Sequence, residues 1–192
     1  MVPIALDPRN ARLAIAGNGA LAVRRLQALR AAGAEDVLVF ADAAEPALIA
    51  QAGTALRTRL PDDADLQVLH VLWIAGLEGP AEAKTLAAAA RRLRVLVNVE
   101  DRPEFCDFHS VAEVRRKNLT LTVSTNGKAP GLASSIRRSL EQCFGPEWDA
   151  RVEEIAALRA DWRAAGVPMA EAARRIDALV AERCWLPCQK TH

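Results

Sequence analysis

Short apolar runs alternate with helical patterns over the first hundred residues. Two such runs, 12–16 and 37–40, flank a stretch whose apolar positions recur at helical spacing up to Gly33. A short apolar run bounded by glycine is typical of a buried strand, and glycine is a common helix stop. The pattern therefore predicts a strand, a glycine turn, a helix and a second strand, which make one βαβ unit with a right-handed crossover. The helical positions are Val23, Leu26 and Leu29.

The same alternation continues to about residue 100. Pro46 suits the first position of a helix over 46–52. The next expected elements are an edge strand (55–60), a central buried strand (66–75), an Ala-rich helix (80–93) and another buried strand (95–99). Strands that alternate with helices indicate an α/β fold with a doubly wound parallel sheet. His70 falls inside the expected central strand, so we interpret it as a core histidine.

Beyond residue 110 the pattern changes. Residues 119–124 alternate apolar and polar positions, which predicts a half-exposed strand. A loop over 124–130 precedes three expected helices, at 131–143, 149–165 and 169–183. We expect three parts with the boundaries 1–110, 111–145 and 146–192.

Composition excludes several classes of protein. The chain has 192 residues, of which 51% are hydrophobic and 26% charged, so intrinsic disorder is not expected. No apolar stretch approaches the roughly 18 residues that a membrane helix needs, and the N-terminal residues do not have the pattern of a signal peptide. We therefore expect a soluble cytoplasmic protein.

Four cysteines are interpreted as reduced thiols, because their spacing is not that of a structural zinc site. No metal site is expected. They are Cys106, Cys143, Cys184 and Cys188.

Charge is concentrated in one segment. Residues 111–145 carry six basic and two acidic residues, a net of +4, whereas residues 1–110 carry −2 and residues 146–192 carry −1. Such a segment in a chain of net charge +1 suits an anionic ligand, and it also suits a solvated helix face. No nucleic-acid role is expected, because no binding motif accompanies the charge. The basic residues are Arg115, Arg116, Lys117, Lys128, Arg137 and Arg138.

A glycine motif lies between the first expected strand and helix. It reads Gly17-Asn18-Gly19-Ala20-Leu21-Ala22. In a dinucleotide site the first glycine makes the tight turn, the second leaves room for the pyrophosphate, and the third small residue lets the helix pack on the strand. The motif predicts cofactor binding at these residues, and a purely structural turn is the alternative.

Acidic residues follow two of the expected strands. Asp42 lies 23 residues after Gly19, where an acid binds the ribose hydroxyls and favours NAD over NADP; a helix cap is the alternative. Asp101 follows the strand over 95–99, where ligands of open α/β sheets bind, so it is a candidate general acid or base. An ordinary strand-end turn is its alternative. His109 is a further candidate for proton transfer or for binding an acidic ligand.

Four segments in order carry a resemblance to a known family: 17–34, NVEDRPEF (98–105), LTLTVSTNGKAPGLASSIRRSLE (119–141), and a final helical segment. The chain resembles the precorrin-2 dehydrogenase/sirohydrochlorin ferrochelatase module of sirohaem synthases, in its stand-alone form, over roughly residues 5–180. The segment STNGKAPGLA is the most discriminating, because a generic Rossmann enzyme has no reason to carry it.

The resemblance implies a Rossmann NAD-binding domain, a dimerisation segment and a small helical C-terminal domain. It implies NAD-dependent oxidation of precorrin-2 to sirohydrochlorin, by a homodimer, and some members also insert Fe²⁺. The essential aspartate of the family falls on Asp101, and its loop hydroxyls fall on Ser124 and Thr125. The basic segment, with Lys128, Arg137 and Arg138, would then meet a tetrapyrrole with eight carboxylates.

Two segments depart from the pattern of the family: 75–79, which reads AGLEG, and 108–111, which reads FHSV. These departures motivate an alternative function, a non-catalytic sensor or carrier that binds NAD(H) or a tetrapyrrole on the same fold.

Overall fold

The computed structural model describes residues 2–77 and 79–186. Contacts between residues divide the chain after Ser110 into two compact units, which are described separately. The further boundary predicted at residue 145 stays a prediction.

The first unit is built on a sheet of five parallel strands in the order β3-β2-β1-β4-β5. β1 pairs with β2 on one side and with β4 on the other, so the order of strands reverses at β1. Open α/β sheets bind ligands at such a reversal, outside the carboxyl ends of the strands. The strands are β1 (Leu13–Ala16), β2 (Val37–Phe40), β3 (Leu56–Arg57), β4 (Val71–Ile74) and β5 (Leu96–Val99).

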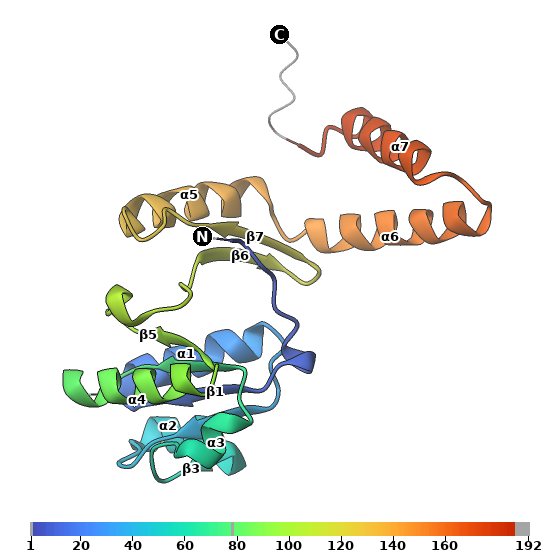
Figure 1. The fold of residues 1–192 in the computed structure, drawn as a ribbon. Coiled ribbons are helices and arrows are strands. Elements are labelled where there is room, and N and C mark those ends of the chain that lie inside the picture. The colour runs from blue at the N-terminus through green and yellow to red at the C-terminus, as the bar shows by residue number, and fades with distance from the viewer. Residues whose placement is uncertain (1, 78, 187–192) are drawn as a thin grey trace. The chain divides into compact units, whose positions relative to one another are not determined.

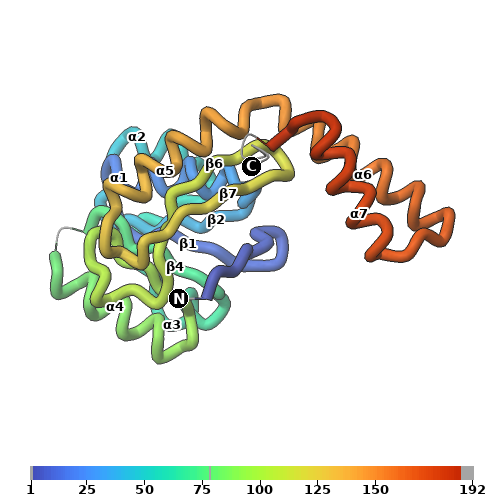
Figure 2. The backbone as a smooth tube through the Cα atoms, turned by 90° about the horizontal axis from the view of Figure 1, so that it is seen from above, coloured from blue at the N-terminus to red at the C-terminus, as the bar shows by residue number. Residues whose placement is uncertain are grey.

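Helices cover both faces of this sheet (Figures 1 and 2). One face packs against α1 (Gly19–Ala31) and α2 (Pro46–Ala52) around the fully buried Ile15 and Leu26. The other face packs against α3 (Asp63–Gln67) and α4 (Pro80–Arg92). The observed unit confirms the predicted α/β class. Short 3₁₀ turns occur at Pro8–Asn10, Gly53–Ala55 and Pro103–Phe105.

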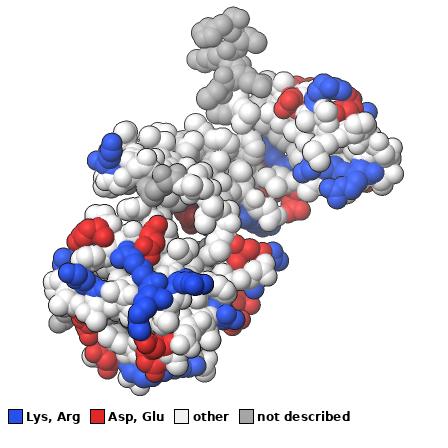
Figure 3. Space-filling model, in the orientation of Figure 1, with Lys and Arg blue, Asp and Glu red and all other residues white. Residues whose placement is uncertain are grey.

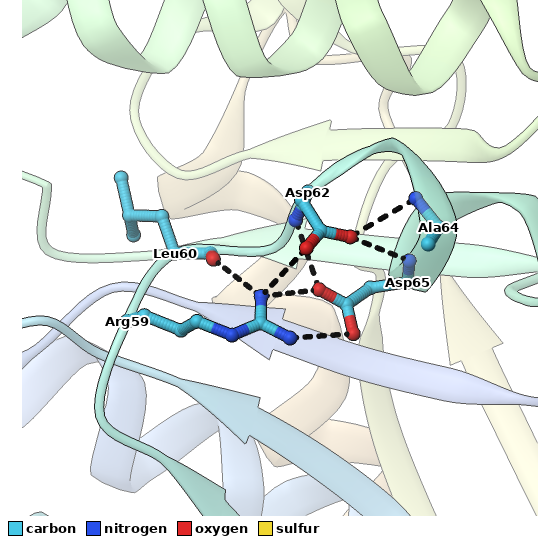
Figure 4. Close-up of polar contacts among 5 residues, drawn as sticks. All are labelled: Arg59, Leu60, Asp62, Ala64 and Asp65. Carbon is cyan, nitrogen blue, oxygen red and sulfur yellow. Dashed lines mark hydrogen bonds and ion pairs between the residues drawn. The ribbon is translucent and has the colours of Figure 1, made fainter.

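The prediction of one long strand over 66–75 is wrong. Residues Asp63–Gln67 form α3, and the strand is only β4. The helix begins there because Asp62 caps it: its carboxylate accepts hydrogen bonds from the amides of Ala64 and Asp65, and the Asp65 carboxylate accepts one from the Asp62 amide. This reciprocal arrangement is a capping box. Arg59 adds an ion pair with Asp65 (Figure 4).

His70 is therefore not a core residue. It is exposed and precedes β4, and its Nδ1 accepts a hydrogen bond from the Arg12 amide at 2.9 Å. The edge strand is also shorter than the predicted 55–60, since β3 has only two residues.

The second unit begins with an antiparallel hairpin of β6 (Ala112–Arg116) and β7 (Leu119–Val123). The alternation over 119–124 correctly predicts β7, whereas β6 has no expected counterpart. α5 (Pro130–Cys143) packs on the hairpin, and α6 (Trp148–Ala164) and α7 (Met169–Glu182) follow. Arg151 lies over the rings of Trp148 and Trp185, which ties the chain three residues beyond the end of α7 to the start of α6.

Candidate active site

The carboxyl ends of the parallel strands bring most of the candidate residues of the first unit to one edge of the sheet. The glycine turn follows β1, Asp42 follows β2, Gly76 follows β4 and Asp101 follows β5. Because β2, β1, β4 and β5 are consecutive in the sheet, these segments line a continuous edge. This is the edge at which a ligand of an open α/β sheet is expected.

Gly17 and Gly76 let two backbone turns approach each other at the centre of this edge. A β-carbon on Gly17 would lie 1.9 Å from the Ala75 carbonyl oxygen, and one on Gly76 would lie 2.0 Å from the Asn18 carbonyl oxygen. The Asn18 amide donates to the Ala75 oxygen at 3.1 Å. The first glycine of the motif therefore allows the turn after β1 to pack directly against the turn after β4.

The N-terminus of α1 fits the anionic part of a dinucleotide. Within residues 2–77 and 79–186 no side chain caps the helix, and its first turn has no acidic residue. Free amides and the helix dipole at such a terminus attract a pyrophosphate. The nearest atoms to a β-carbon on Gly19 would be those of the Glu45 carboxylate, at 3.5 Å, so a phosphate would lie over this glycine only with the flexible end of Glu45 turned aside. Ala20 is exposed on this turn, whereas Ala22 is fully buried against the sheet.

The Asn18 side chain contacts the loop after β2. Its Nδ2 donates to the Ala43 carbonyl oxygen at 2.5 Å, and its Oδ1 accepts from the Glu45 amide at 2.9 Å. Asn18 therefore positions this loop through its side chain. Asp42 lies in the same loop, is exposed, and has no hydrogen bond or ion pair with any residue that the structure describes. Its carboxylate is available to a ribose.

Asp101 occupies an exposed turn after β5 with a left-handed φ of 59°. The neighbouring Glu100 points to α1, where its Oε2 lies 2.7 Å from Arg25 Nη2. Glu100 and Arg102 also line a hollow of about 40 Å³ between the ends of β4 and β5 and the start of α4. Arg25 is a residue that the sequence did not single out. The only signal for it was a basic residue nearly two turns into the helix of the glycine motif.

Residues 106–108 lie along the free edge of β5. The Asp107 carboxylate accepts a hydrogen bond from the Val97 amide and pairs with Arg91 of α4 at 2.7 Å. The buried Asn98 donates to the Phe108 carbonyl oxygen at 2.9 Å. Cys106 is half-buried, and its burial raises the pKa of the thiol, so it stays protonated near neutral pH. These contacts fix the chain that follows Asp101.

The remaining candidate of the first unit is His109. It is half-buried, and its ring has no hydrogen-bond partner among the residues that the structure describes.

Ser124, Thr125 and Lys128 lie in the loop before α5, in the second unit. The hydroxyls stabilise the loop itself, because Ser124 Oγ accepts from the Asn126 amide and Thr125 Oγ1 accepts from the Ala129 amide. Lys128 is exposed and unpaired in the described part of the chain. The loop leads into the N-terminus of α5, a second helix terminus suited to an anion.

The two candidate arginines of α5 have different partners. Arg137 pairs with Glu141 one turn later, at 2.7 Å. Arg138 is exposed and donates to Ser135 Oγ at 2.9 Å, with no ion pair within the described ranges. Arg115 is likewise neutralised by Glu113. Among the described residues, the excess positive charge of the segment therefore rests on Arg138, Lys128, Lys117 and Arg116.

Residues 2–77 and 79–186 contain no group of three or more side chains that could hold a metal ion. No helix in these ranges has the length and apolar character needed to cross a membrane. Of the cysteines, Cys143 and Cys184 are exposed thiols, and Cys188 lies outside the described residues. On the face shown in Figure 3, basic and acidic side chains of the first unit are interleaved, so that face offers no uniform basic surface.

Family models match both units. A model described as "Putative NAD(P)-binding" matches residues 4–112, which is more than half of the chain. A second, described as "Sirohaem biosynthesis protein central", matches residues 116–142. The chain belongs to the family of the first model, the putative NAD(P)-binding proteins. Together with the sirohaem match over 116–142, this confirms the resemblance found in the sequence.

Individual relatives agree with the family. The chain is 36% identical to a siroheme synthase of Methylococcus capsulatus over 165 residues, which are 84% of this chain and 34% of the relative. It is 32% identical to a siroheme biosynthesis protein of Schizosaccharomyces pombe over 113 residues, 59% of this chain and 42% of the relative. The chain thus spans about a third to two fifths of the length of these relatives.

A solved structure, SirC, a precorrin-2 dehydrogenase, shares the fold. It superposes with a TM-score of 0.74 at 16% sequence identity, covering 99% of this chain and 94% of that one. At this identity the similarity shows the fold.

Proposed function

We propose that this chain oxidises precorrin-2 to sirohydrochlorin with NAD as the hydride acceptor. The observation that carries the proposal is that two features lie at the same carboxyl edge of the sheet: the N-terminus of α1, which no described side chain caps, and the exposed Asp101. Membership of the NAD(P)-binding family supports a nicotinamide cofactor. The names of the relatives, siroheme synthase and precorrin-2 dehydrogenase, support the substrate and the reaction.

The cofactor would lie across the carboxyl edge. The free amides of α1 would bind its pyrophosphate over Gly19, and Asp42 would accept hydrogen bonds from the adenosine ribose. A 2′-phosphate would meet the charge of Asp42, which favours NAD over NADP. The bound nicotinamide supplies the acceptor for a hydride.

The reaction removes one hydride and one proton from the substrate. Because the hydride leaves for the nicotinamide, the proton needs a base. Asp101 is the exposed carboxylate at the end of β5, and we assign the base to it. Glu100 is engaged by Arg25 and is less suited to that role.

The tetrapyrrole would bind through its carboxylates. The N-terminus of α5, Lys128 and Arg138 present positive potential without a neutralising carboxylate in the described residues. Ser124, Thr125 and His109 are further proposed contacts, and Arg137 is a weaker one because Glu141 already neutralises it.

A homodimer is part of the proposal. Both edges of the β6–β7 hairpin lack a partner strand in the described chain, and an isolated hairpin is marginal. α5 also exposes Leu132 and Ile136, on one side of the helix. The surface over α5 in Figure 3 carries few charged side chains. Pairing of two hairpins across a two-fold axis would complete the sheet.

The test is an assay of NADH absorbance with purified protein, enzymatically made precorrin-2 and NAD. We expect NADH to form in proportion to sirohydrochlorin. Tetrapyrrole binding without NADH would favour the sensor or carrier instead. A second arm with sirohydrochlorin and Fe²⁺ tests whether this chain also inserts iron, and localisation to the cytoplasm stays a prediction.

A further inference from the structure

The turn that carries Asp101 has a left-handed conformation and is held by contacts on both sides. It is closed by a hydrogen bond of 3.2 Å from the Arg102 amide to the Val99 carbonyl oxygen, and Asp101 has a φ of 59°. A left-handed φ costs most residues with a side chain roughly 1–2 kcal/mol, and Asp is among the residues that tolerate it best. Such a conformation persists where its surroundings fix it.

The first support comes from α1. Arg25 Nη2 lies 2.7 Å from Glu100 Oε2, and the two side chains are only 17% and 28% exposed. The side chain of Val99 packs on the α3 and α4 face of the sheet, so the next residue, Glu100, points to the opposite face, where α1 lies. The ion pair therefore joins the glycine-motif helix to the end of β5, two strands away from β1.

The second support comes from the chain after the turn. Cys106 Sγ lies 3.2 Å from the Val99 amide, from which it accepts a hydrogen bond. The same sulfur lies 3.3 Å from the carbonyl oxygens of Val99 and of Arg102. Its single proton can be donated to either carbonyl, so the thiol links both ends of the turn. The Asp107 carboxylate forms an ion pair with Arg91 and accepts a hydrogen bond from the Val97 amide. These contacts fix the position of the neighbouring Cys106.

We propose that Arg25 is a positioning residue for Asp101, acting through Glu100, and that the Cys106 thiol holds the other side of the same turn. This inference rests on the proposed function, in which Asp101 is the base. A partly buried ion pair adds little net stability, but it fixes geometry. A displacement of about 1 Å in a reacting group lowers the rate by up to about 100-fold.

The first test measures hydrogen exchange and needs neither substrate nor cofactor. We expect Arg25→Gln to speed amide exchange in a peptide that covers 98–106 and to leave a peptide from β2 and α2 unchanged. Arg24→Gln is the matched control, because Arg24 is exposed on the same helix and has no ion pair in the described residues. Cys106→Ala should also speed amide exchange in the 98–106 peptide. Cys106→Ser should keep the exchange slow, because a hydroxyl can make the same hydrogen bonds. Equal exchange rates in the Arg25→Gln and Arg24→Gln variants would overturn the role of Arg25. Unchanged exchange in Cys106→Ala would overturn the role of the thiol.

The second test separates positioning from general stability. Arg25→Gln should lower kcat by about 10- to 100-fold with little change in KM. The double variant Arg25→Gln/Glu100→Gln should recover part of that loss, because it removes the carboxylate left without its partner. A kcat within about twofold of wild type, or a double variant slower than Arg25→Gln, contradicts the inference. A wild-type protein that does not oxidise precorrin-2 refutes the proposed function, and the exchange experiment still decides whether Arg25 positions the turn.

Discussion

The two glycines of the motif should fail in different ways when they are replaced by alanine. A β-carbon on Gly17 would overlap the Ala75 carbonyl, at 1.9 Å from its oxygen and 2.7 Å from its carbon, and the φ of Gly17 is +136°. Relief requires separation of β1 from the end of β4. That separation breaks the hydrogen bonds from the Asn18 amide to the Ala75 oxygen and from the Ala75 amide to the Ala16 oxygen, at 3.1 and 2.9 Å.

The magnitude follows from these contacts. Overpacking costs about 1–3 kcal/mol, a positive φ roughly 1–2 kcal/mol, and each lost hydrogen bond about 1 kcal/mol. We expect Gly17→Ala to lower the free energy of unfolding by about 4–7 kcal/mol, a large share of the roughly 5–15 kcal/mol of a typical domain. Gly19→Ala meets only the flexible end of Glu45 at a φ of +68°, so its cost is about 1–2 kcal/mol.

Urea unfolding followed by circular dichroism measures both values. Gly76→Ala is a matched control, since its β-carbon would lie 2.0 Å from the Asn18 oxygen, and it should resemble Gly17→Ala. Calorimetry with NAD tests whether the turn binds the cofactor. Gly19→Val should abolish NAD binding in a protein that remains folded. Equal unfolding free energies for Gly17→Ala and Gly19→Ala would refute the structural reasoning, and unchanged affinity in Gly19→Val would remove the turn as the cofactor site.

Three further predictions concern the basic segment, the α3 cap and the assembly. Arg138→Ala should raise KM for precorrin-2 several-fold, and Arg137→Ala should raise it less, because Arg137 is already paired; steady-state kinetics in which Arg137 has the larger effect would contradict this. The side-chain hydrogen bonds from Arg59 lower the pKa of Asp65, so Asp65 stabilises the fold above its ordinary pKa of 3.8, and this stabilisation is lost as the pH falls through the lower folded-state value. Asp65→Asn should therefore lower the free energy of unfolding by about 1 kcal/mol at pH 7 and by progressively less below about pH 4. Urea unfolding at pH 7 and below pH 4 checks the direction of this change. Sedimentation should show a dimer that Leu132→Asp weakens, and a wild-type monomer at micromolar concentration would exclude the proposed assembly.

Strong local signals allowed most of the fold to be predicted from the sequence. The glycine turn, the apolar runs of β1, β2 and β5, and the helix from Pro80 all have periodic patterns or clear boundaries. The prediction of a strand over 66–75 was wrong for a physical reason. Its apolar residues look continuous, but the side chains of Asp62 and Asp65 cap a helix there, and apolar periodicity does not report such polar contacts.

The candidate site was less predictable, because its contacts join residues far apart in the sequence. Asp101 could be named from its place after a strand. Its support by Arg25 joins positions 75 residues apart, and only the order of strands brings α1 to the end of β5. The first role given to Gly17, a tight turn, also missed its closest contact, which is with Ala75 on the neighbouring strand.

The central claim is the oxidation of precorrin-2 with Asp101 as the base. The most direct measurement compares wild type and Asp101→Asn for NADH formation from precorrin-2 and NAD, together with the affinity of each for sirohydrochlorin. We expect wild type to form NADH, and Asp101→Asn to bind sirohydrochlorin almost normally while its kcat falls by about 10²–10⁴-fold. Near-full kcat in Asp101→Asn would contradict the assignment of the base, and the absence of NADH with wild type would contradict the function itself.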